Sequence, residues 1–310
     1  MSTLKILEGD CVASLRNLET ESVQCCVTSP PYFGLRDYGH DGQIGLEPTP
    51  DEYVAKIVEV FREVRRVLRK DGTLWLNLGD SYAGSGKGPA GNFGKTHNER
   101  EMTHTKASGL VPDGLKPKDL IGIPWRVAFA LQADGWYLRQ DIIWHKPNPM
   151  PESVQDRCTK AHEYIFLLSR SEKYFYDNKS IAEPVAESSV KRLTQPNIGN
   201  QLGSYRVPGK TNGPMKAVGN CEFRNRRTVW TINTQGFKGA HFATFPVELP
   251  RLCILAGSRA GDVVLDPFGG SGTTGQVALE SGRSAILCEL NPEYIALIRQ
   301  RCTTTIGLSL

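Results

Sequence analysis

The fold is decided by residues 23–32, which read VQCCVTSPPY. The largely apolar run Val23–Val27 predicts a buried parallel strand. Pro30 and Pro31 cannot continue that strand, because proline lacks the N–H that a sheet ladder requires and restricts the residue before it. The chain must therefore leave the sheet abruptly. This places a rigid loop at the carboxyl end of a strand, where open α/β sheets bind their ligands.

The loop carries groups that suit a planar heterocycle with an exocyclic amine. The Ser29 hydroxyl and the Pro30 carbonyl are two hydrogen-bond acceptors, and the Tyr32 ring is a flat stacking surface. The same residues also occur in plain turns and in polyproline ligands, so a catalytic interpretation requires a cofactor site elsewhere in the chain.

A second strand and loop near the other end of the chain predict that cofactor site. Residues 262–274 read DVVLDPFGGSGTT, a strand that runs into a glycine-rich loop and then a helix to Glu280. Glycines let the backbone approach a ligand, and a helix amino terminus offers unpaired N–H groups to an anionic group. The next strand, residues 284–288, ends at Glu289, about twenty residues after the loop, where dinucleotide-type folds place a carboxylate for ribose hydroxyls.

The glycine spacing separates a nucleoside cofactor from two alternatives. The run has no Gly-x-Gly-x-x-Gly, which disfavours an NAD oxidoreductase, and no lysine follows the glycines, which argues against a nucleotide P-loop.

The remaining pattern predicts an α/β fold whose sheet is mostly parallel and turns antiparallel at one edge. Thr49, Pro50 and Glu52 form a helix start with a capping box. The loop at 33–46 is expected beside the site, and the loop at 83–119 is expected to be functional or disordered. The predicted elements are strands at 4–8, 22–27, 73–78, 136–144 and 228–232, a hairpin of 163–168 with 173–176, and helices at 11–18, 49–72, 124–135 and 246–256, with a last helix after Asn291-Pro292.

Composition bounds the class of protein. The 310 residues allow one large α/β domain with insertions or two domains. The sequence shows no membrane-length apolar run and no signal pattern at its amino terminus, so we expect a cytoplasmic protein without membrane partners. The eight cysteines form no Cys-x-x-Cys pair, which indicates small core residues in a reducing compartment. Cys158 and His162 are four apart, but no second pair completes a zinc site, and no metal is predicted.

Basic residues concentrate between positions 186 and 228. The segment holds eight of them against Glu187 and Glu222, an excess of six, although the whole chain carries only +4. Such a concentration is typical of phosphate contacts, while a merely solvated charged face is the alternative. The residues predicted to contact DNA are Arg192, Arg206, Lys210, Arg224, Arg226 and Arg227.

Together the two loops resemble those of the beta-type amino-group (N4-cytosine/N6-adenine) DNA methyltransferases. In that family the catalytic motif, here Thr28–Tyr32, precedes the recognition region, and the S-adenosylmethionine motif, here Asp266–Thr274, follows it. Residues 242–249 resemble the family segment just before the cofactor strand, and Gly9-Asp10 resembles its acidic turn near the adenine. The resemblance implies a Rossmann-like S-adenosylmethionine-dependent methyltransferase fold with a mixed sheet and circularly permuted motif order. Its catalytic domain would span 1–179 and 226–310, with an inserted recognition region at 180–225.

The resemblance also implies roles for individual residues. It makes Glu289 the ribose ligand and places Asp10 and Phe245 beside the adenosine, although Asp10 could instead cap a helix and Phe245 could pack in the core. Trp144, His145 and Lys146 are expected to form a wall of the base pocket, unless they are a buried tryptophan and a polar loop. The catalytic residues are Ser29, Pro30, Pro31 and Tyr32, and the cofactor residues are Asp10, Thr28, Phe245, Asp266, Pro267, Phe268, Gly269, Gly270, Ser271, Gly272, Thr273 and Glu289.

The implied reaction is methyl transfer from S-adenosyl-L-methionine to an exocyclic amine of double-stranded DNA. The amine is a poor nucleophile, and acceptors at Ser29 and Pro30 would favour a pyramidal nitrogen aimed at the methyl group. The target base would be flipped out of the duplex and stacked on Tyr32, a contact worth roughly 1–3 kcal/mol. Serine at position 29 resembles the cytosine-N4 members, so N4 of cytosine is predicted, with adenine N6 as the alternative.

Other classes of function compete with this prediction. The chain could be an inactive DNA-binding protein with a vestigial site, or a methyltransferase for RNA or protein, although the basic segment suits a duplex backbone better. The sequence leaves open the recognition site, a cognate restriction endonuclease and a homodimer as partner.

Overall fold

The computed structural model describes residues 2–35, 37–40, 42–84, 111–194, 222–234 and 245–306. The chain divides into two compact units. The larger unit comprises Met1–Tyr176 and Thr228–Leu310, and the smaller unit is Asp177–Arg227. These bounds fall within a few residues of the division drawn from the sequence. The smaller unit's role in target recognition stays a prediction.

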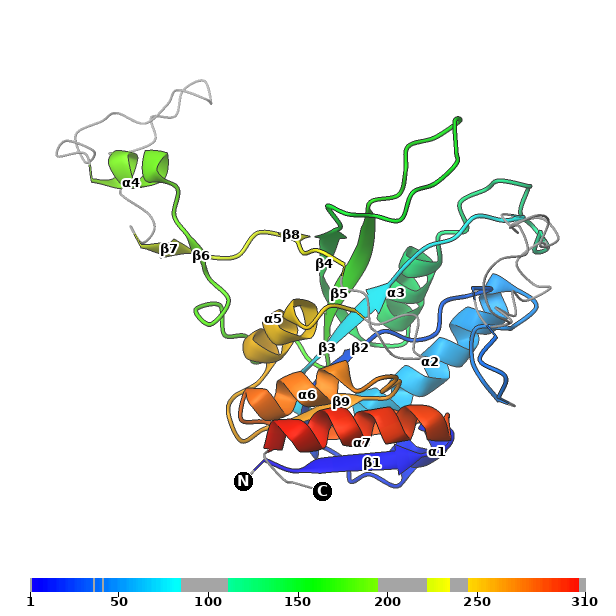
Figure 1. Cartoon of the computed structure of the whole chain (residues 1–310), viewed down its shortest axis with the longest axis horizontal. Helices are drawn as coiled ribbons and strands as arrows, with labels where there is room; N and C mark the ends of the chain where they lie inside the picture. Colours follow the sequence, from blue (N-terminus) through cyan, green and yellow to red (C-terminus); the bar gives the residue numbers. More distant parts are fainter. Residues whose placement is uncertain are drawn as a thin grey trace. The chain divides into compact units, whose positions relative to one another are not determined.

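An eight-stranded sheet forms the centre of the larger unit, in the order β1-β10-β9-β2-β3-β5-β4-β8 (Figure 1). Every neighbouring pair is parallel except the two pairs made by β5, which runs against both β3 and β4. The strands are β1 (Leu4–Glu8), β2 (Val23–Thr28), β3 (Leu68–Leu78), β4 (Tyr137–His145), β5 (His162–Ser169), β8 (Val229–Thr231), β9 (Val263–Asp266) and β10 (Ser284–Glu289).

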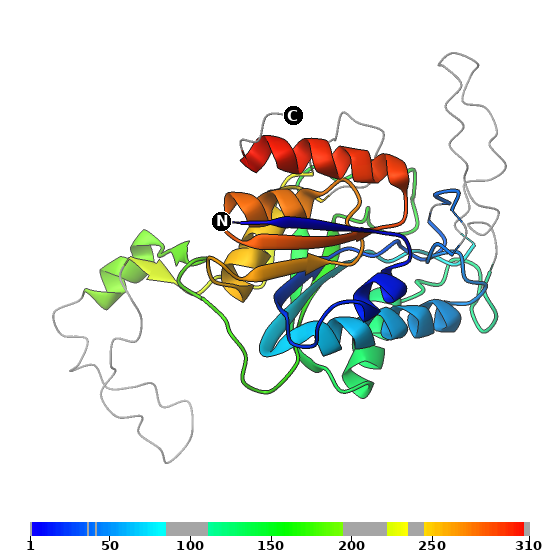
Figure 2. The same cartoon turned by 90° about the horizontal axis from the view of Figure 1, so that it is seen from below.

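Helices cover both faces of this sheet (Figure 2). One face carries α1 (Cys11–Arg16), α2 (Pro50–Val67) and α3 (Ile123–Ala133), and the other carries α5 (Glu248–Gly257), α6 (Thr273–Glu280) and α7 (Pro292–Ile306). The predicted capping box of α2 is present, with Thr49 and Glu52 each bonded to the other's backbone N–H. None of the helices within the described ranges is long and apolar enough to span a bilayer.

Two sequence predictions about the sheet are wrong. Residues 173–176 form no strand, because their aromatic rings pack on side chains: Tyr176 stacks on Trp75 at 6.2 Å, and the Arg259 guanidinium lies 3.9 Å from the Phe175 ring centre. The antiparallel strand is also not at an edge. The long connection after β4 returns β5 beside it, and β5 then pairs with β3, so it lies inside the sheet.

The boundary between α2 and β3 also differs from the prediction. The apolar periodicity predicted a helix up to Gly72, whereas α2 ends at Val67 and β3 begins at Leu68. Leu68 has an extended backbone and pairs with Val23 of β2, so strand pairing overrides the helical pattern.

The position of β2 in the sheet brings the two predicted loops together. β2 pairs with β3 on one side and with β9 on the other, with Cys25 opposite Val264 and Cys26 opposite Leu265. The strand order therefore switches direction at β2, and ligands bind at such switch points. The loops that follow β2 and β9 leave the same edge of the sheet as neighbours.

The smaller unit contains a short antiparallel pair and one helix. β6 (Glu183–Pro184) pairs with β7 (Phe223–Arg224), and α4 spans Glu187–Leu193. Of its predicted DNA-contacting residues, Arg224 and Arg227 pair with Glu183, and Arg226 donates to the Ile181 carbonyl at 2.7 Å. The Arg192 side chain, Arg206 and Lys210 lie outside the described residues.

Candidate active site

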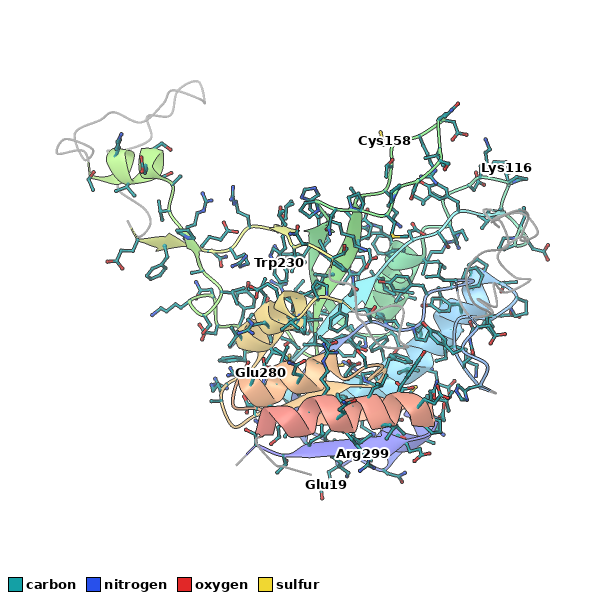
Figure 3. The ribbon with its side chains drawn as sticks, viewed as in Figure 1. Glu19, Lys116, Cys158, Trp230, Glu280 and Arg299 are labelled. Carbon is teal, nitrogen blue, oxygen red and sulfur yellow. The ribbon has the colours of Figure 1, made fainter. Side chains whose placement is uncertain are left out.

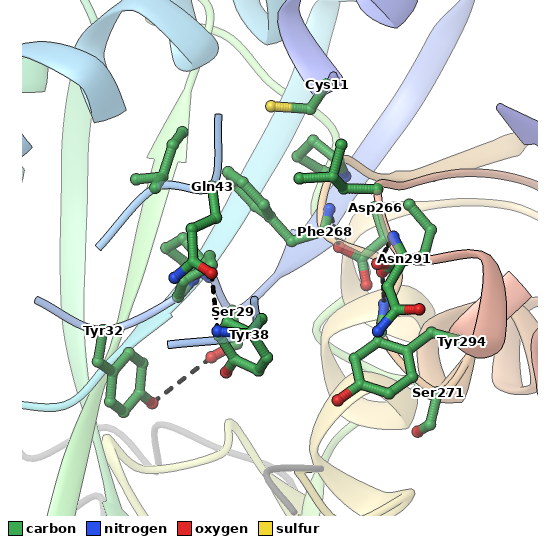
Figure 4. Close-up of a pocket in the computed structure, with 18 of the residues that line it drawn as sticks. Cys11, Ser29, Tyr32, Tyr38, Gln43, Asp266, Phe268, Ser271, Asn291 and Tyr294 are labelled. Carbon is green, nitrogen blue, oxygen red and sulfur yellow. Dashed lines mark hydrogen bonds between the residues drawn. The ribbon is translucent and has the colours of Figure 1, made fainter. Parts of the chain in front are cut away.

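A cavity of about 680 Å³ lies at the carboxyl edge of the sheet, between the two loops (Figure 4). Both loops contribute to its lining, and so does the chain that follows Tyr32, through Tyr38 and Gln43. Among the predicted site residues within the described ranges, Thr28, His145 and Gly272 do not line it. Those that do are Asp10, Ser29, Pro30, Pro31, Tyr32, Trp144, Lys146, Phe245, Asp266, Pro267, Phe268, Gly269, Gly270, Ser271, Thr273 and Glu289.

Asp266 joins the two loops. Its carboxylate accepts hydrogen bonds from the Thr28 hydroxyl at 2.6 Å, the Thr274 hydroxyl at 2.8 Å and the Phe268 N–H at 3.0 Å. Thr28 ends β2 and Asp266 ends β9, so one buried side chain fixes the spacing of the predicted catalytic and cofactor loops. Burial raises the pKa of Asp266 to about 7.

The raised pKa of Asp266 is expected to make the free energy of unfolding depend on pH. Because the folded protein binds this proton more tightly than the unfolded chain, Asp266 contributes stability that is lost as pH rises toward 7. Asp266→Asn keeps the shape but cannot titrate, so the stability of the native protein relative to the variant should fall between pH 5 and 7, by at most about 1.4 kcal/mol per pH unit. Urea unfolding of both proteins across this range measures the difference, and parallel curves would contradict the prediction.

Glu289 anchors the glycine-rich loop at the end of β10. Its carboxylate accepts from the Gly270 N–H at 2.7 Å and from the Asn291 N–H at 2.8 Å. The side chain is half-buried and lines the cavity, and burial raises its pKa. The carboxylate is therefore held by the backbone of two loops, with acceptor capacity left for a ligand.

The glycines of residues 269–272 serve the protein's own packing as well as the cavity. Gly270 and Gly272 have φ values of 52° and 82°, which favour glycine. A side chain at Gly272 would meet Ile298 of α7 at 3.2 Å, and one at Gly269 would meet Leu287 of β10 at 3.1 Å. Gly272 thus allows the loop to pack closely against α7, while Gly269 and Gly270 also line the cavity.

The sequence left open whether Asp10 and Phe245 face a ligand or serve the protein's own structure, and both residues line the cavity. Asp10 caps α1, since its side chain accepts from the Ala13 N–H at 2.8 Å, and it also lines the cavity. Phe245 is half-buried and lines the cavity too. The preceding residues of the family-like segment, 242–244, lie outside the described residues.

The predicted base side of the cavity holds a chain of hydrogen bonds that begins at Ser29. The Ser29 hydroxyl lies 3.5 Å from the Tyr32 oxygen (Figure 4). The Tyr32 hydroxyl donates to Glu163 at 2.7 Å. Burial, and then the Glu163 charge, raise the pKa of Tyr32 well above its ordinary value, so the phenol stays protonated. Asn77 also donates to Glu163, at 3.2 Å. The Pro31 carbonyl is engaged elsewhere, by the Tyr53 hydroxyl at 2.9 Å.

Lys146 and Trp144 form a wall of the cavity, while His145 faces away from it. The Lys146 ammonium pairs with Glu163 and lies 4.2 Å from the centre of the Trp144 ring. Trp144 is buried, and its indole N–H donates to the Ile232 carbonyl at 2.9 Å. The His145 ring contacts the Thr231 hydroxyl at 3.2 Å. Trp144 and His145 point in opposite directions because successive side chains along β4 alternate between the two faces of the sheet.

Sequence reasoning missed several residues of the cavity. Glu163 is the second residue of β5, and its only sequence signal is a charged residue in front of a buried run. Asn77 is a polar residue inside a buried strand, a stronger signal, because buried amides need partners. Others include Tyr38, His40 and Gln43 from the loop at 33–46, Asn291 and Tyr294 at the start of α7, and Met150 and Thr234.

No cluster of three or more metal-ligating side chains occurs within the described ranges. Cys158 is exposed, and the cysteines that are buried are Cys11, Cys25, Cys26, Cys253, Cys288 and Cys302.

A mixed sheet with a switch point, a carboxylate at the end of the second cofactor strand and two loops facing one cavity define a nucleoside-cofactor enzyme of the methyltransferase type. The comparisons with known proteins specify the family. The chain belongs to the N6/N4 DNA methylase family, whose model matches residues 23–300.

Full-length relatives are type II methyltransferases. The chain is 48% identical to M.SmaI of Serratia marcescens, over 97% of this chain and 91% of the relative. It is 49% identical to M.Cfr9I of Citrobacter freundii, over 96% of this chain and 86% of the relative. The chain is thus a type II DNA methyltransferase of the N4/N6 class.

Solved structures share the fold. The PvuII DNA methyltransferase, described as cytosine-N4-specific, matches with a TM-score of 0.64 and 20% identity over 100% of this chain and 88% of the other. TTHA0409 of Thermus thermophilus, solved with S-adenosyl-L-methionine, matches with a TM-score of 0.60 and 23% identity over 99% of this chain and 96% of the other. These matches agree with the predicted methyltransferase fold.

Proposed function

We propose that the protein methylates the exocyclic N4 of cytosine in duplex DNA, at a specific site and with the base flipped into the cavity. One observation carries the proposal: Ser29 and the glycine-rich loop line a single cavity, because Asp266 locks the ends of β2 and β9 together. A methyl donor and an amine held in the same cavity meet the requirement for direct transfer. We expect this reaction to take place in the cytoplasm.

The cofactor is S-adenosyl-L-methionine, which supplies a methyl group activated by its sulfonium. The residues around the glycine-rich loop fit such a group. Glu289 offers a half-buried carboxylate for ribose hydroxyls, Phe245 and Phe268 offer apolar surface, and the amino terminus of α6 faces the loop. Asp10 and Ser271 complete this side of the cavity.

Ser29 acts as a hydrogen-bond acceptor in this mechanism. The Tyr32 hydroxyl donates to Glu163, so the Tyr32 oxygen can only accept from Ser29. The hydroxyl proton of Ser29 is thereby turned toward Tyr32, and its lone pairs are left for the amine of the base. Together with the Pro30 carbonyl, they hold the amine hydrogens and aim the nitrogen lone pair at the methyl donor.

The choice of cytosine rests on Ser29 and on a structural relative. Serine at this position resembles the cytosine-N4 members of the family, and the PvuII enzyme, described as cytosine-N4-specific, shares the fold. Target recognition is assigned to the smaller unit, whose excess of basic residues suits phosphate contacts.

Nucleoside mass spectrometry tests the proposal. Unmethylated DNA of varied sequence is incubated with the protein and S-adenosyl-L-methionine, digested and analysed. N4-methylcytosine is the expected product. N6-methyladenine would overturn the base assignment and keep the mechanism, while the absence of both products would overturn the function.

Gly79→Ala is predicted to impair methyl transfer through Tyr32. A Cβ atom at Gly79 would lie 2.6 Å from the Tyr32 ring, so the ring must move away from its bonds to Glu163 and Ser29. A displacement of that size should slow transfer roughly 10- to 100-fold. Cofactor affinity should not change, because Tyr32 belongs to the base side of the cavity.

A double-mutant comparison measures whether Gly79→Ala acts through Tyr32. Single-turnover rates are determined for Gly79→Ala, Tyr32→Ala and the double variant. The double variant should be no slower than Tyr32→Ala alone, since both changes remove the same contact. Fully additive losses would contradict this explanation.

A further inference from the structure

Met150 is an apolar side chain at the mouth of the cavity. It is 83% exposed, whereas every other large hydrophobic side chain in the described ranges is at most 55% exposed. Single exposed hydrophobic residues are common on protein surfaces. Within the described ranges, Met150 is the more exposed of two such side chains that also line the cavity, the other being Leu35 at 48%. It therefore contacts both the solvent and the entrance through which a base must pass.

The backbone that carries Met150 is restrained on its amino-terminal side. Asn148 makes three hydrogen bonds with Thr234, which also lines the cavity. The Thr234 N–H donates to the Asn148 side chain at 2.9 Å, the Asn148 amide donates to the Thr234 carbonyl at 3.3 Å, and the Thr234 hydroxyl donates to the Asn148 carbonyl at 3.3 Å. Pro149 and Pro151 flank Met150 and restrict the backbone on either side of it.

The carboxyl-terminal part of the same β4–β5 connection is also tied to the larger unit. Arg157 pairs with Glu152 at 2.5 Å, and its guanidinium lies 4.1 Å from the centre of the Tyr82 ring. Asp156 pairs with Lys118 at 2.6 Å. The connection, in which Cys158 is labelled in Figure 3, projects beyond the strands that it joins. The loop thus presents Met150 from a backbone held on both sides.

Met150 is close in sequence to the proposed base side of the cavity. Four residues before it, Lys146 pairs with Glu163, which accepts from Tyr32. A base that leaves a DNA duplex for Ser29 and Tyr32 must enter the cavity that Met150 lines. Its departure leaves a gap in the base stack, and proteins that open DNA often fill such gaps with an apolar wedge.

We propose that Met150 inserts into the base stack and occupies the space that the flipped target base leaves. The inference rests on the proposed base-flipping function. The thioether suits this role, because it is apolar, unbranched and able to adapt to the stacked bases on either side. Met150 takes no part in the chemical step, and its contribution is to lower the cost of moving the base out of the stack.

The test compares two duplexes under single-turnover conditions with excess protein. Both contain the site at which the native protein methylates DNA, and the second has an abasic position opposite the target base, so that this base is already unpaired. Met150→Ala should methylate the paired duplex roughly 10- to 100-fold more slowly than the native protein, and the second duplex within about twofold of it. Met150→Leu should restore most of the rate on paired DNA.

Phe129→Ala serves as a matched control, because Phe129 is also exposed, at 55%, and does not line the cavity among the described residues. Its rate on both duplexes should equal that of the native protein. Equal rates for Met150→Ala and the native protein on paired DNA would overturn the wedge, and so would an equal loss on both duplexes. If the native protein methylates no DNA, so that no such site can be chosen, the proposed function is overturned, and the wedge with it.

Discussion

Replacement of Ser29 by alanine is expected to lower the rate of methyl transfer roughly 10²- to 10³-fold, the loss typical of removing one preorganised hydrogen-bonding group from a transition state. The Ser29 oxygen is the acceptor that Tyr32 turns toward the cavity. Alanine leaves the amine of the base with one acceptor fewer as its nitrogen becomes pyramidal. The affinity for S-adenosyl-L-methionine should not change, because Glu289 and the glycine-rich loop are untouched.

Two measurements separate the chemical role of Ser29 from a structural one. Single-turnover transfer of tritiated methyl to DNA gives the rate, and isothermal titration calorimetry gives the cofactor affinity. Ser22→Ala is a suitable control, since Ser22 precedes the opposite end of β2 and donates to the Glu19 carbonyl. A fully active Ser29→Ala variant would exclude the proposed mechanism. Loss of cofactor binding in this variant would show that Ser29 contacts the cofactor and not the base.

Glu289→Ala should weaken cofactor binding roughly 10- to 100-fold, because hydrogen bonds to charged groups contribute about 1.5–3 kcal/mol. The carboxylate accepts from the Gly270 N–H and the Asn291 N–H, and in the proposed function it also accepts from the ribose hydroxyls. Its removal therefore loosens the loop and deletes a ligand contact in the same step. The rate at saturating cofactor should fall much less than the affinity.

Calorimetry with S-adenosyl-L-methionine measures this effect on binding. Glu293→Ala provides the control, because Glu293 is an exposed carboxylate in the first turn of α7 and does not line the cavity within the described ranges. Cofactor affinity equal to that of the native protein in Glu289→Ala would show that this carboxylate is not the ribose ligand.

Local sequence patterns predicted the elements that position the site. The apolar runs before Ser29 and Asp266 became β2 and β9, the capping box at Thr49 begins α2, and Asn291 accepts from the Glu293 N–H at the start of α7. Such signals depend on residues close together in the chain. The ends of these elements were less predictable, as at Leu68, because strand pairing decided where the helix ends.

Side-chain packing between distant segments could not be predicted from local sequence patterns. Residues 173–176 alternate like a strand, yet Phe175 and Tyr176 pack against Arg259 and Trp75. Glu163 looked like the first residue of a buried strand and is the acceptor for Tyr32, Asn77 and Lys146. Its partners come from three other parts of the chain, so no short-range pattern indicates the contact.

The sequence alone determined that one strand runs into a proline-rich loop and another into a glycine-rich loop, because prolines and glycines set the backbone geometry within a few residues. Only the tertiary structure decided that these loops share one cavity. Their meeting depends on the parallel pairing of β2 with β9 and on the bond from Thr28 to Asp266. These contacts join residues far apart in the chain, and folding brings them together by burying the strands between two layers of helices.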